Sequence, residues 1–313
     1  ILMSLITVLC ANPCIDKTLR LPEVFPGRTN RVEKTIRSIG GKGINVAASA
    51  KNLGLKVRCL YFSHQEGGAA VAEFLRDKGI EGRSVPVSGR LRENIKIFEQ
   101  NNKQLTEFNE SGDALIEADA KKMLTLATEA LKDSDIFVLS GSIPPGLPAE
   151  LYAEIIAQAN FCGVRTILDT DGEAMFQGIR AVPFFMKPNK AELGHIFGRP
   201  LSSSGDVALA AKRLLDEGIA YVCASMGNDG ALLACRDGIF LCDALDVPVK
   251  GTVGTGDSMV AGICKALIEG GEPDKILIYG CAAAHASVIH EGTTPCTKAD
   301  FEKFIPELTV IRM

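Results

Sequence analysis

The sequence lacks the features that mark membrane, secreted and nucleic-acid-binding proteins. None of its 313 residues lie in a low-complexity tract, and no apolar stretch free of charge and glycine is long enough to span a membrane. The ten cysteines form no CxxC pair and are too scattered for a disulfide scaffold, which favours reduced thiols in the cytoplasm. A net charge of -4 argues against nucleic acid as the main partner. We therefore expect a cytoplasmic globular protein that binds small molecules, with no nucleic acid and no membrane among its partners.

Histidine is also scarce, and its positions suggest no chemistry. The four histidines are His64, His195, His285 and His290. Their spacing fits neither a metal site nor a catalytic triad, so we expect packing or surface roles.

The apolar N-terminus ILMSLITVLCA has no basic leader, which argues against a signal peptide. We interpret it as a buried first strand. Met3 is the expected natural start, with Ile1 and Leu2 as additions.

The chain is long enough for one large core, and 46% of its residues are hydrophobic. From Ile116 onward, helical and strand patterns alternate, which predicts βα crossovers and a mostly parallel sheet covered on both faces. Several predicted strands end in polar residues, which would meet at one edge of the sheet. We expect residues 1–313 to form a single α/β domain.

Two inserts, residues 17–37 and 84–110, have a different character. They alternate apolar and polar residues, which predicts partly exposed strands, and both are basic. We expect them to form one small sheet that covers a site as a lid. Apolar residues such as Ile95, Ile97 and Phe98 suggest pairing with a second copy.

The glycine-rich stretch KGTVGTGDSMVAGICKAL, residues 250–267, predicts a loop that opens a helix. Backbone N–H groups and the helix N-terminus would together bind an anion there. Asp257 would be repelled by that anion unless it has another task. It is either a helix cap or a general base that takes a proton from a hydroxyl group during phosphoryl transfer.

A second glycine loop, residues 40–47, also precedes a helical pattern. It matches neither a Walker A loop nor a dinucleotide fingerprint. Lys42 and Asn45 would approach a small polar ligand, or the glycines would merely allow close packing. Asp16 follows the first strand and would either receive sugar hydroxyls or serve as a turn residue after Pro13.

Taken together, these blocks resemble the PfkB family of carbohydrate kinases. The matching stretches, in the family's order, are residues 12–16, 40–46, 140–146, 187–193, 225–231 and 252–258. The resemblance implies a ribokinase-like α/β fold, which is a three-layer sandwich with a mostly parallel central sheet and a small β lid. It also implies a homodimer formed through the lid.

Within the family, the chain resembles sugar-phosphate kinases, first those acting on fructose 1-phosphate and next those acting on tagatose 6-phosphate. The signals are the NPCID opening, residues 29–32, 92–97 and 106–110, and the TVGTGDSMVAG block. The basic inserts agree independently, because a sugar phosphate brings an anionic group that a neutral sugar lacks. The implied substrates are ATP and a sugar phosphate, with Mg²⁺ as cofactor.

The resemblance also implies roles for individual residues. The residues expected to bind the hydroxyls of the sugar are Asp16, Gly41 and Asn45. Those expected to bind its phosphate are Arg92, Lys42 and, as a weaker candidate, Arg28. The residues expected to bind the nucleotide are Lys187, Asn189, Ser225, Gly227 and Gly230. Gly254 and Gly256 would also contact it and would form the anion hole beside the catalytic base Asp257. Glu192 and Asn189 would hold Mg²⁺ through water, unless Glu192 is simply a first-turn helix charge.

Four residues depart from the family pattern. Ser63 and His64 stand where paired glycines are frequent, and Arg90 stands where a TxR motif would begin. Asp171 replaces a usual serine, and we expect it to face solvent. Two other classes stay open, namely a kinase of nucleosides or unphosphorylated sugars and a sugar-phosphate sensor without catalysis.

Overall fold

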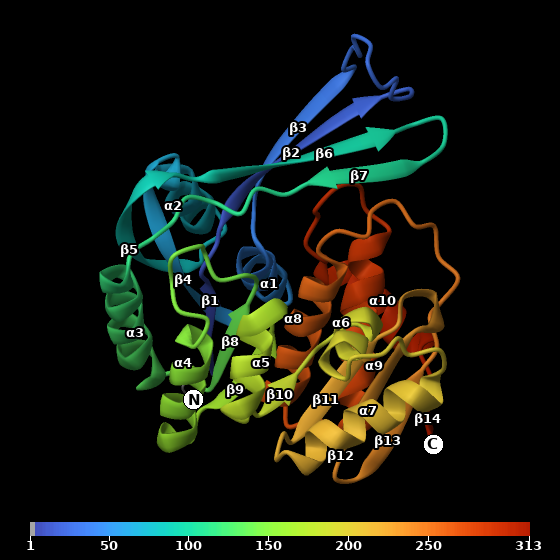
Figure 1. The fold of residues 1–313 in the computed structure, drawn as a ribbon. Coiled ribbons are helices and arrows are strands. Elements are labelled where there is room, and N and C mark those ends of the chain that lie inside the picture. The colour runs from blue at the N-terminus through green and yellow to red at the C-terminus, as the bar shows by residue number, and fades with distance from the viewer. Residues whose placement is uncertain (1–3) are drawn as a thin grey trace.

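A computed structural model of the chain describes residues 4–313. The expectation about Ile1, Leu2 and Met3 lies outside the described residues. Figure 1 shows a large body of helices and strands, with a small sheet projecting above one end of it.

The body is built on a ten-stranded sheet in the order β14-β13-β12-β11-β10-β9-β8-β1-β4-β5. Its parallel strands are β1 (Leu5–Cys10), β4 (Lys56–Glu66), β5 (Glu81–Arg90), β8 (Ile136–Ser140), β9 (Arg165–Asp169), β10 (Phe185–Met186) and β11 (Tyr221–Ser225). Three antiparallel strands extend one edge, namely β12 (Ala231–Cys235), β13 (Gly238–Cys242) and β14 (Val310–Arg312). The predicted mostly parallel sheet is confirmed.

Helices cover both faces of this sheet. One layer contains α1 (Lys42–Asn52), α2 (Gly68–Asp77), α8 (Thr255–Ile268), α9 (Pro273–Val288) and α10 (Lys298–Phe304). The other contains α3 (Glu117–Leu131), α4 (Leu151–Cys162), α5 (Gly172–Arg180), α6 (Lys190–Ile196) and α7 (Ser204–Asp216). Neighbouring residues of β1 show why its sequence is apolar throughout, because Val8 packs with α1 and α8 whereas Leu9 packs with α3 and α4. The result is the three-layer sandwich expected of a ribokinase-like fold.

The small sheet is the predicted lid. Its strand order is β3-β2-β6-β7, with β2 (Cys14–Leu21), β3 (Lys34–Gly40), β6 (Arg92–Glu99) and β7 (Gln104–Phe108). Both inserts contribute strands, but the predicted boundary of the second is wrong, because residues 84–90 belong to β5 in the main sheet. Val85 and Val87 alternate with polar residues because one face of this edge strand packs into the core near α3.

Among residues 4–313, the structure contains no helix that is both long and apolar enough to cross a membrane.

Candidate active site

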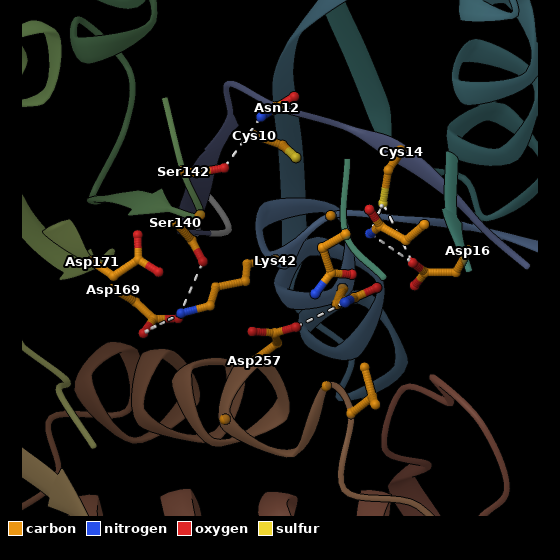
Figure 2. Close-up of a pocket in the computed structure, with 18 of the residues that line it drawn as sticks. Cys10, Asn12, Cys14, Asp16, Lys42, Ser140, Ser142, Asp169, Asp171 and Asp257 are labelled. Carbon is orange, nitrogen blue, oxygen red and sulfur yellow. Dashed lines mark hydrogen bonds and ion pairs between the residues drawn. The ribbon is translucent and has the colours of Figure 1, made fainter. Parts of the chain in front are cut away.

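A cavity of about 660 Å³ lies where the strands of the main sheet end and the lid begins (Figure 2). It brings together most of the residues that the sequence singled out, although they come from six separate parts of the chain. The predicted residues that line it are Asp16, Gly41, Lys42, Asn45, Arg92, Lys187, Asn189, Glu192, Ser225, Gly254, Gly256 and Asp257.

A second cavity of about 310 Å³ adjoins the first, and the two share Ser225, Thr252 and Gly256. Gly227 and Gly230 line this second cavity, whose walls are otherwise largely apolar. The glycine loop before α8 therefore lies where the two cavities meet.

Arg28, predicted as a weaker contact of the phosphate, does not lie at these cavities. It is exposed in the connection between β2 and β3 and lines neither cavity of this chain. The run of basic residues in the insert extends beyond the part of the lid that covers the cavity.

The glycine loop opens a helix, as the sequence predicts. Gly254 is the N-cap of α8 and has a φ of 82°, a conformation that glycine adopts without strain. Gly256 lies beside Lys187, because a Cβ atom at Gly256 would be 3.4 Å from the ammonium nitrogen. The first N–H groups of a helix lack intrahelical partners and carry partial positive charge. This loop is therefore suited to binding an anion between the two cavities.

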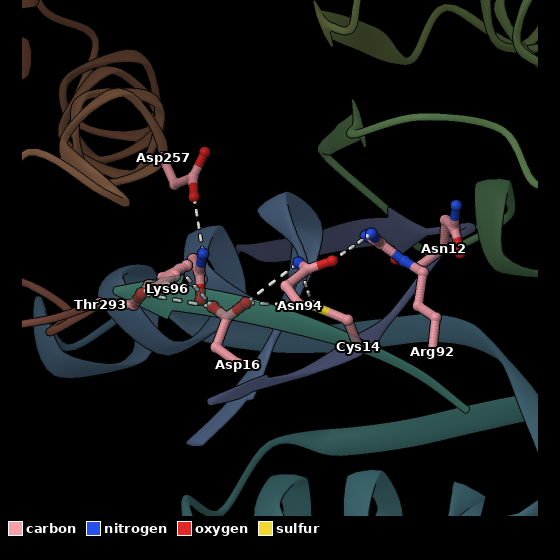
Figure 3. Close-up of polar contacts among 9 residues, drawn as sticks. Asn12, Cys14, Asp16, Arg92, Asn94, Lys96, Asp257 and Thr293 are labelled. Atoms are coloured by element: carbon pink, nitrogen blue, oxygen red, sulfur yellow. Dashed lines mark hydrogen bonds and ion pairs between the residues drawn. The ribbon is translucent and has the colours of Figure 1, made fainter. Parts of the chain in front are cut away.

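Asp257 lies in the first turn of α8 and is 5% exposed. Its carboxylate accepts a hydrogen bond of 2.8 Å from the side-chain amide of Asn45, on α1, rather than capping its own helix (Figure 3). Burial, followed by the negative charge of Asp169, raises the pKa of Asp257 from 3.8 to about 6. A carboxyl group with such a pKa is suited to general base catalysis near neutral pH.

Asp169, at the end of β9, is a site residue to which the sequence analysis assigned no role. It is 1% exposed, and its carboxylate lies 3.3 Å from the ammonium of Lys187 and 3.7 Å from that of Lys42. Burial opposes its ionisation, but the two ammonium groups outweigh burial and lower its pKa. The charge of Asp169 in turn raises the pKa of Lys42. Asp169 thus holds two cations in the first cavity.

Lys42 and Arg92 lie in one cavity but interact with different groups. The ammonium of Lys42 points toward Asp169 (Figure 2) and lies 3.9 Å from Glu192. The guanidinium of Arg92 donates to the backbone carbonyls of Asn12, at 2.8 Å, and Glu110, at 2.9 Å. A shared phosphate clamp formed by Lys42 and Arg92 therefore finds no support in their contacts.

Asp16 lies on lid strand β2 and not in a loop after β1. Its carboxylate contacts Lys96 at 2.8 Å, Asn94 at 3.1 Å and Thr293 at 3.3 Å (Figure 3). All but Thr293 line the cavity. Sequence reasoning assigned no role to Asn94, Lys96 or Thr293, although the alternation of Arg92, Asn94 and Lys96 along β6 places these three on one face.

Asn189 and Glu192 form a capping box at the start of α6. The side chain of each residue accepts a hydrogen bond of 2.8 Å from the backbone N–H of the other. Glu192 is therefore a charge in the first turn of a helix, as one of the two expectations had it. Its second carboxylate oxygen nevertheless faces Lys42 in the cavity. Within residues 4–313, no three acidic, histidine or cysteine side chains form a group that could hold a metal. The donors present suit a Mg²⁺ ion bound mainly by phosphate and water.

The departures from the family pattern lie at the margin of the site. His64, on β4, is 5% exposed, burial lowers its pKa, and its Nδ1 atom has no hydrogen-bond partner. Neither it nor Ser63 lines the cavity. Arg90 pairs with Glu110 at 3.0 Å outside the cavity, whereas Asp171 is exposed and lines it.

The raised pKa of Asp257 predicts a pH-dependent effect on stability. Because the pKa in the folded state exceeds that in the unfolded state, the stabilisation from protonation is complete below pH 3.8 and is lost as the pH rises through about 6. Asp257→Asn should therefore stabilise the protein increasingly from pH 4 to pH 7, by roughly 3 kcal/mol at most. Urea unfolding of both proteins across this range measures the difference.

A carboxyl group with a lowered pKa provides the control of opposite sign. The hydroxyl and backbone N–H of Ser203 and the N–H of Ser202 lower the pKa of Asp206. Asp206→Asn should thus become more destabilising as the pH rises from 3 to 6. Parallel stability curves for wild type and Asp257→Asn would contradict the assignment for Asp257.

Comparison with known proteins agrees with this geometry. The pattern of the pfkB family carbohydrate kinases matches residues 6–300. The 1-phosphofructokinase of Xanthomonas campestris is 36% identical over 263 residues, covering 82% of each chain. That of Bacillus subtilis is 30% identical over 302 residues, covering 96% of this chain and 98% of the other.

A solved structure shows that the likeness extends to the whole fold. The tetrameric inhibited form of phosphofructokinase-2 from Escherichia coli superposes with a TM-score of 0.89 at 26% identity, covering 98% of this chain and 99% of that one. The strand order, the lid and the glycine loop beside Asp257 thus occur in a chain whose sequence matches one family along almost its entire length, and the protein belongs to the PfkB family of carbohydrate kinases.

Proposed function

We propose that this kinase transfers the γ-phosphoryl group of ATP to the C6 hydroxyl of fructose 1-phosphate, giving fructose 1,6-bisphosphate and ADP. The observation that carries the proposal is the position of Asp257. It is buried on the wall of the first cavity and directly follows Gly256, which lines both cavities. A phosphoryl donor and an alcohol acceptor held in these cavities would meet beside this carboxylate.

The second cavity suits the base and ribose of ATP. Its apolar wall includes Leu245, Val247, Val249, Ala284 and Val288. Gly227 also lines this cavity, and a Cβ atom there would meet no protein atom within 4 Å, so a ligand can approach the backbone closely. A kinase that consumes ATP also fits the cytoplasmic location predicted from the sequence.

The first cavity suits the sugar phosphate. Asn45, Asn94 and Asp16 offer amide and carboxylate groups to hydroxyls, and Arg92 contributes a positive charge near the lid. An Arg guanidinium binds phosphate through charge-assisted hydrogen bonds. The curated 1-phosphofructokinases that resemble this chain support fructose 1-phosphate as the acceptor.

In this mechanism, Asp257 takes the proton of the attacking hydroxyl. Lys42, Lys187 and the N-terminus of α8 offset the negative charge on the transferred group, and positioning supplies much of the acceleration. Mg²⁺, held through water near Glu192 and Asn189, would neutralise charge on the phosphates. The lid would exclude water and so suppress hydrolysis of ATP.

Asp257→Asn should retain ligand binding but lose turnover. The amide preserves the shape and the contact with Asn45 but cannot accept a proton, so kcat should fall by about 10² to 10⁴-fold. Coupled ADP release measures kcat, and calorimetry measures binding of ATP and fructose 1-phosphate. Turnover near the wild-type rate would remove Asp257 as the base.

Arg92→Ala should raise KM for the sugar phosphate about tenfold to a hundredfold, because a charged hydrogen-bond donor is lost. KM for ATP should change far less. Arg90→Ala is the matched control, since Arg90 also contacts Glu110 but lies outside the cavity. Equal effects of both substitutions would show that Arg92 acts through Glu110 rather than on substrate.

The same assay distinguishes the other candidate substrates. Tagatose 6-phosphate, fructose and a nucleoside, each offered in place of fructose 1-phosphate, test the acceptor. Preference for an unphosphorylated acceptor contradicts the proposal, and binding of sugar phosphate without ADP release indicates a sensor.

We further propose that the lid forms a homodimer. Ile95 and Phe108 pair across β6 and β7 on the face opposite the cavity, where they are 36% and 57% exposed. Phe98, which the sequence placed with them, lies instead on the inner face beneath Arg20. Sedimentation should show a dimer that Ile95→Lys dissociates. A wild-type monomer at micromolar concentration, or an unaffected variant, contradicts the proposal.

A further inference from the structure

Lys96 is buried where the lid meets the body, and its surroundings are unusual for a lysine. The residue is 4% exposed and lies on β6, with its ammonium group 2.8 Å from Asp16 on the neighbouring strand β2. The same ammonium donates a hydrogen bond of 2.9 Å to the hydroxyl of Thr293. Thr293 follows α9 and belongs to the body, so this contact joins the two parts of the kinase (Figure 3).

Thr293 also lies against the glycine loop. A Cβ atom at Gly254 would be 3.2 Å from the methyl group of Thr293 and 3.9 Å from the carboxylate of Asp257. A continuous set of contacts therefore runs from Asp16 in the sugar cavity through Lys96 and Thr293 to the N-cap of the helix that carries Asp257.

We infer that Lys96 is a positioning residue that couples occupation of the sugar cavity to the phosphoryl-transfer loop through Thr293. The inference rests on the proposed function, since it assigns Asp16 to the sugar. An ammonium has three N–H groups, and Asp16 and Thr293 use two of them. Because Lys96 lines the cavity, the third is available to the acceptor itself.

Burial makes this arrangement sensitive to the loss of either partner. Two charges removed from water are stabilised only while their geometry is good and their remaining hydrogen bonds are satisfied. Asp16 meets that condition through Asn94 and Thr293 as well as Lys96. The orientation of Asp16 toward the acceptor therefore depends on the loop that also borders Gly254.

Attachment of the lid alone does not explain the contact. Arg20 of β2 and Glu291 of the same loop already form an ion pair at 2.8 Å, in which Glu291 is 54% exposed. That pair lies outside the sugar cavity, whereas Lys96 lines it. The buried contact between Lys96 and Thr293 thus adds something that the exposed ion pair lacks, namely a connection from the sugar cavity to the glycine loop beside Asp257.

The test is a comparison of Thr293→Val with Thr293→Ser, because valine removes only the hydroxyl at nearly constant volume and serine keeps it. Both are assayed with the sugar phosphate on which the wild type is most active. Thr293→Val should lower kcat about tenfold and release more ADP per sugar phosphorylated, with KM for ATP unchanged. Thr293→Ser keeps the hydroxyl that bonds Lys96 and loses only the methyl group facing Gly254, so its losses should be smaller than those of Thr293→Val. A purely steric role of the side chain would give the opposite order, because valine fills the space and serine does not.

Lys96→Met provides the second arm, with an expected loss of about 10²-fold in kcat/KM for the sugar phosphate. Lys17→Met is its control, since Lys17 lies on lid strand β2 but does not line the cavity. Thermal unfolding checks that each variant is folded. If Lys96→Met does not fold, the comparison of Thr293→Val with Thr293→Ser tests the inference. Wild-type kcat and coupling in Thr293→Val, or equal losses in the valine and serine variants, would overturn the inference.

The outcome is separable from that of the proposed substrate. If fructose 1-phosphate is not the preferred acceptor, the proposed function fails, but the coupling is still measured with the acceptor that is preferred.

Discussion

The hydrogen bond between Asn45 and Asp257 is the interaction on which the site depends. It joins the first turns of α1 and α8, the two helices that begin at the two glycine loops. Ser49, one turn further along α1, meets Ser258, the residue that follows Asp257, with 3.0 Å between their hydroxyl oxygens, and this second contact keeps the same helices in register. This packing buries Asp257, and no lysine or arginine of residues 4–313 forms an ion pair with its carboxylate. The carboxylate thus combines a fixed orientation with a proton affinity above the ordinary value.

The lysines elsewhere in the cavity do not cancel the raised proton affinity of Asp257. Lys42 and Lys187 are both engaged by Asp169, so their positive charge is partly balanced before any ligand binds. Phosphate groups entering between them would compete with Asp169 for the same two ammonium groups. An anion-binding site built in this way is preorganised, because its cations are already held in place by the protein.

Local patterns in the sequence predicted the elements that carry the chemistry. The glycine loops and the helices after them, the buried strand at Leu5 to Cys10 and the polar strand ends all follow from neighbouring residues. The sequence could not show which strands pair, so it does not reveal that residues 84–90 lie in β5 at the edge of the main sheet and not in the lid. Nor could it show that Lys96 meets Thr293, a contact between residues 197 positions apart. Basic composition likewise does not reveal which part of an insert covers the cavity, so the sequence alone could not place Arg28 away from it.

The lid and the body contribute different halves of the site. Asp16, Arg92 and Lys96 are carried by strands β2 and β6, whereas Asp257, Lys187 and the apolar wall of the second cavity belong to the body. Substitutions in two short strands can therefore alter which alcohol is accepted while Asp257, Lys187 and the second cavity stay unchanged. Such a modular division gives evolution a simple route to new acceptors within one scaffold, and it marks the inner face of the lid as the place to redesign selectivity.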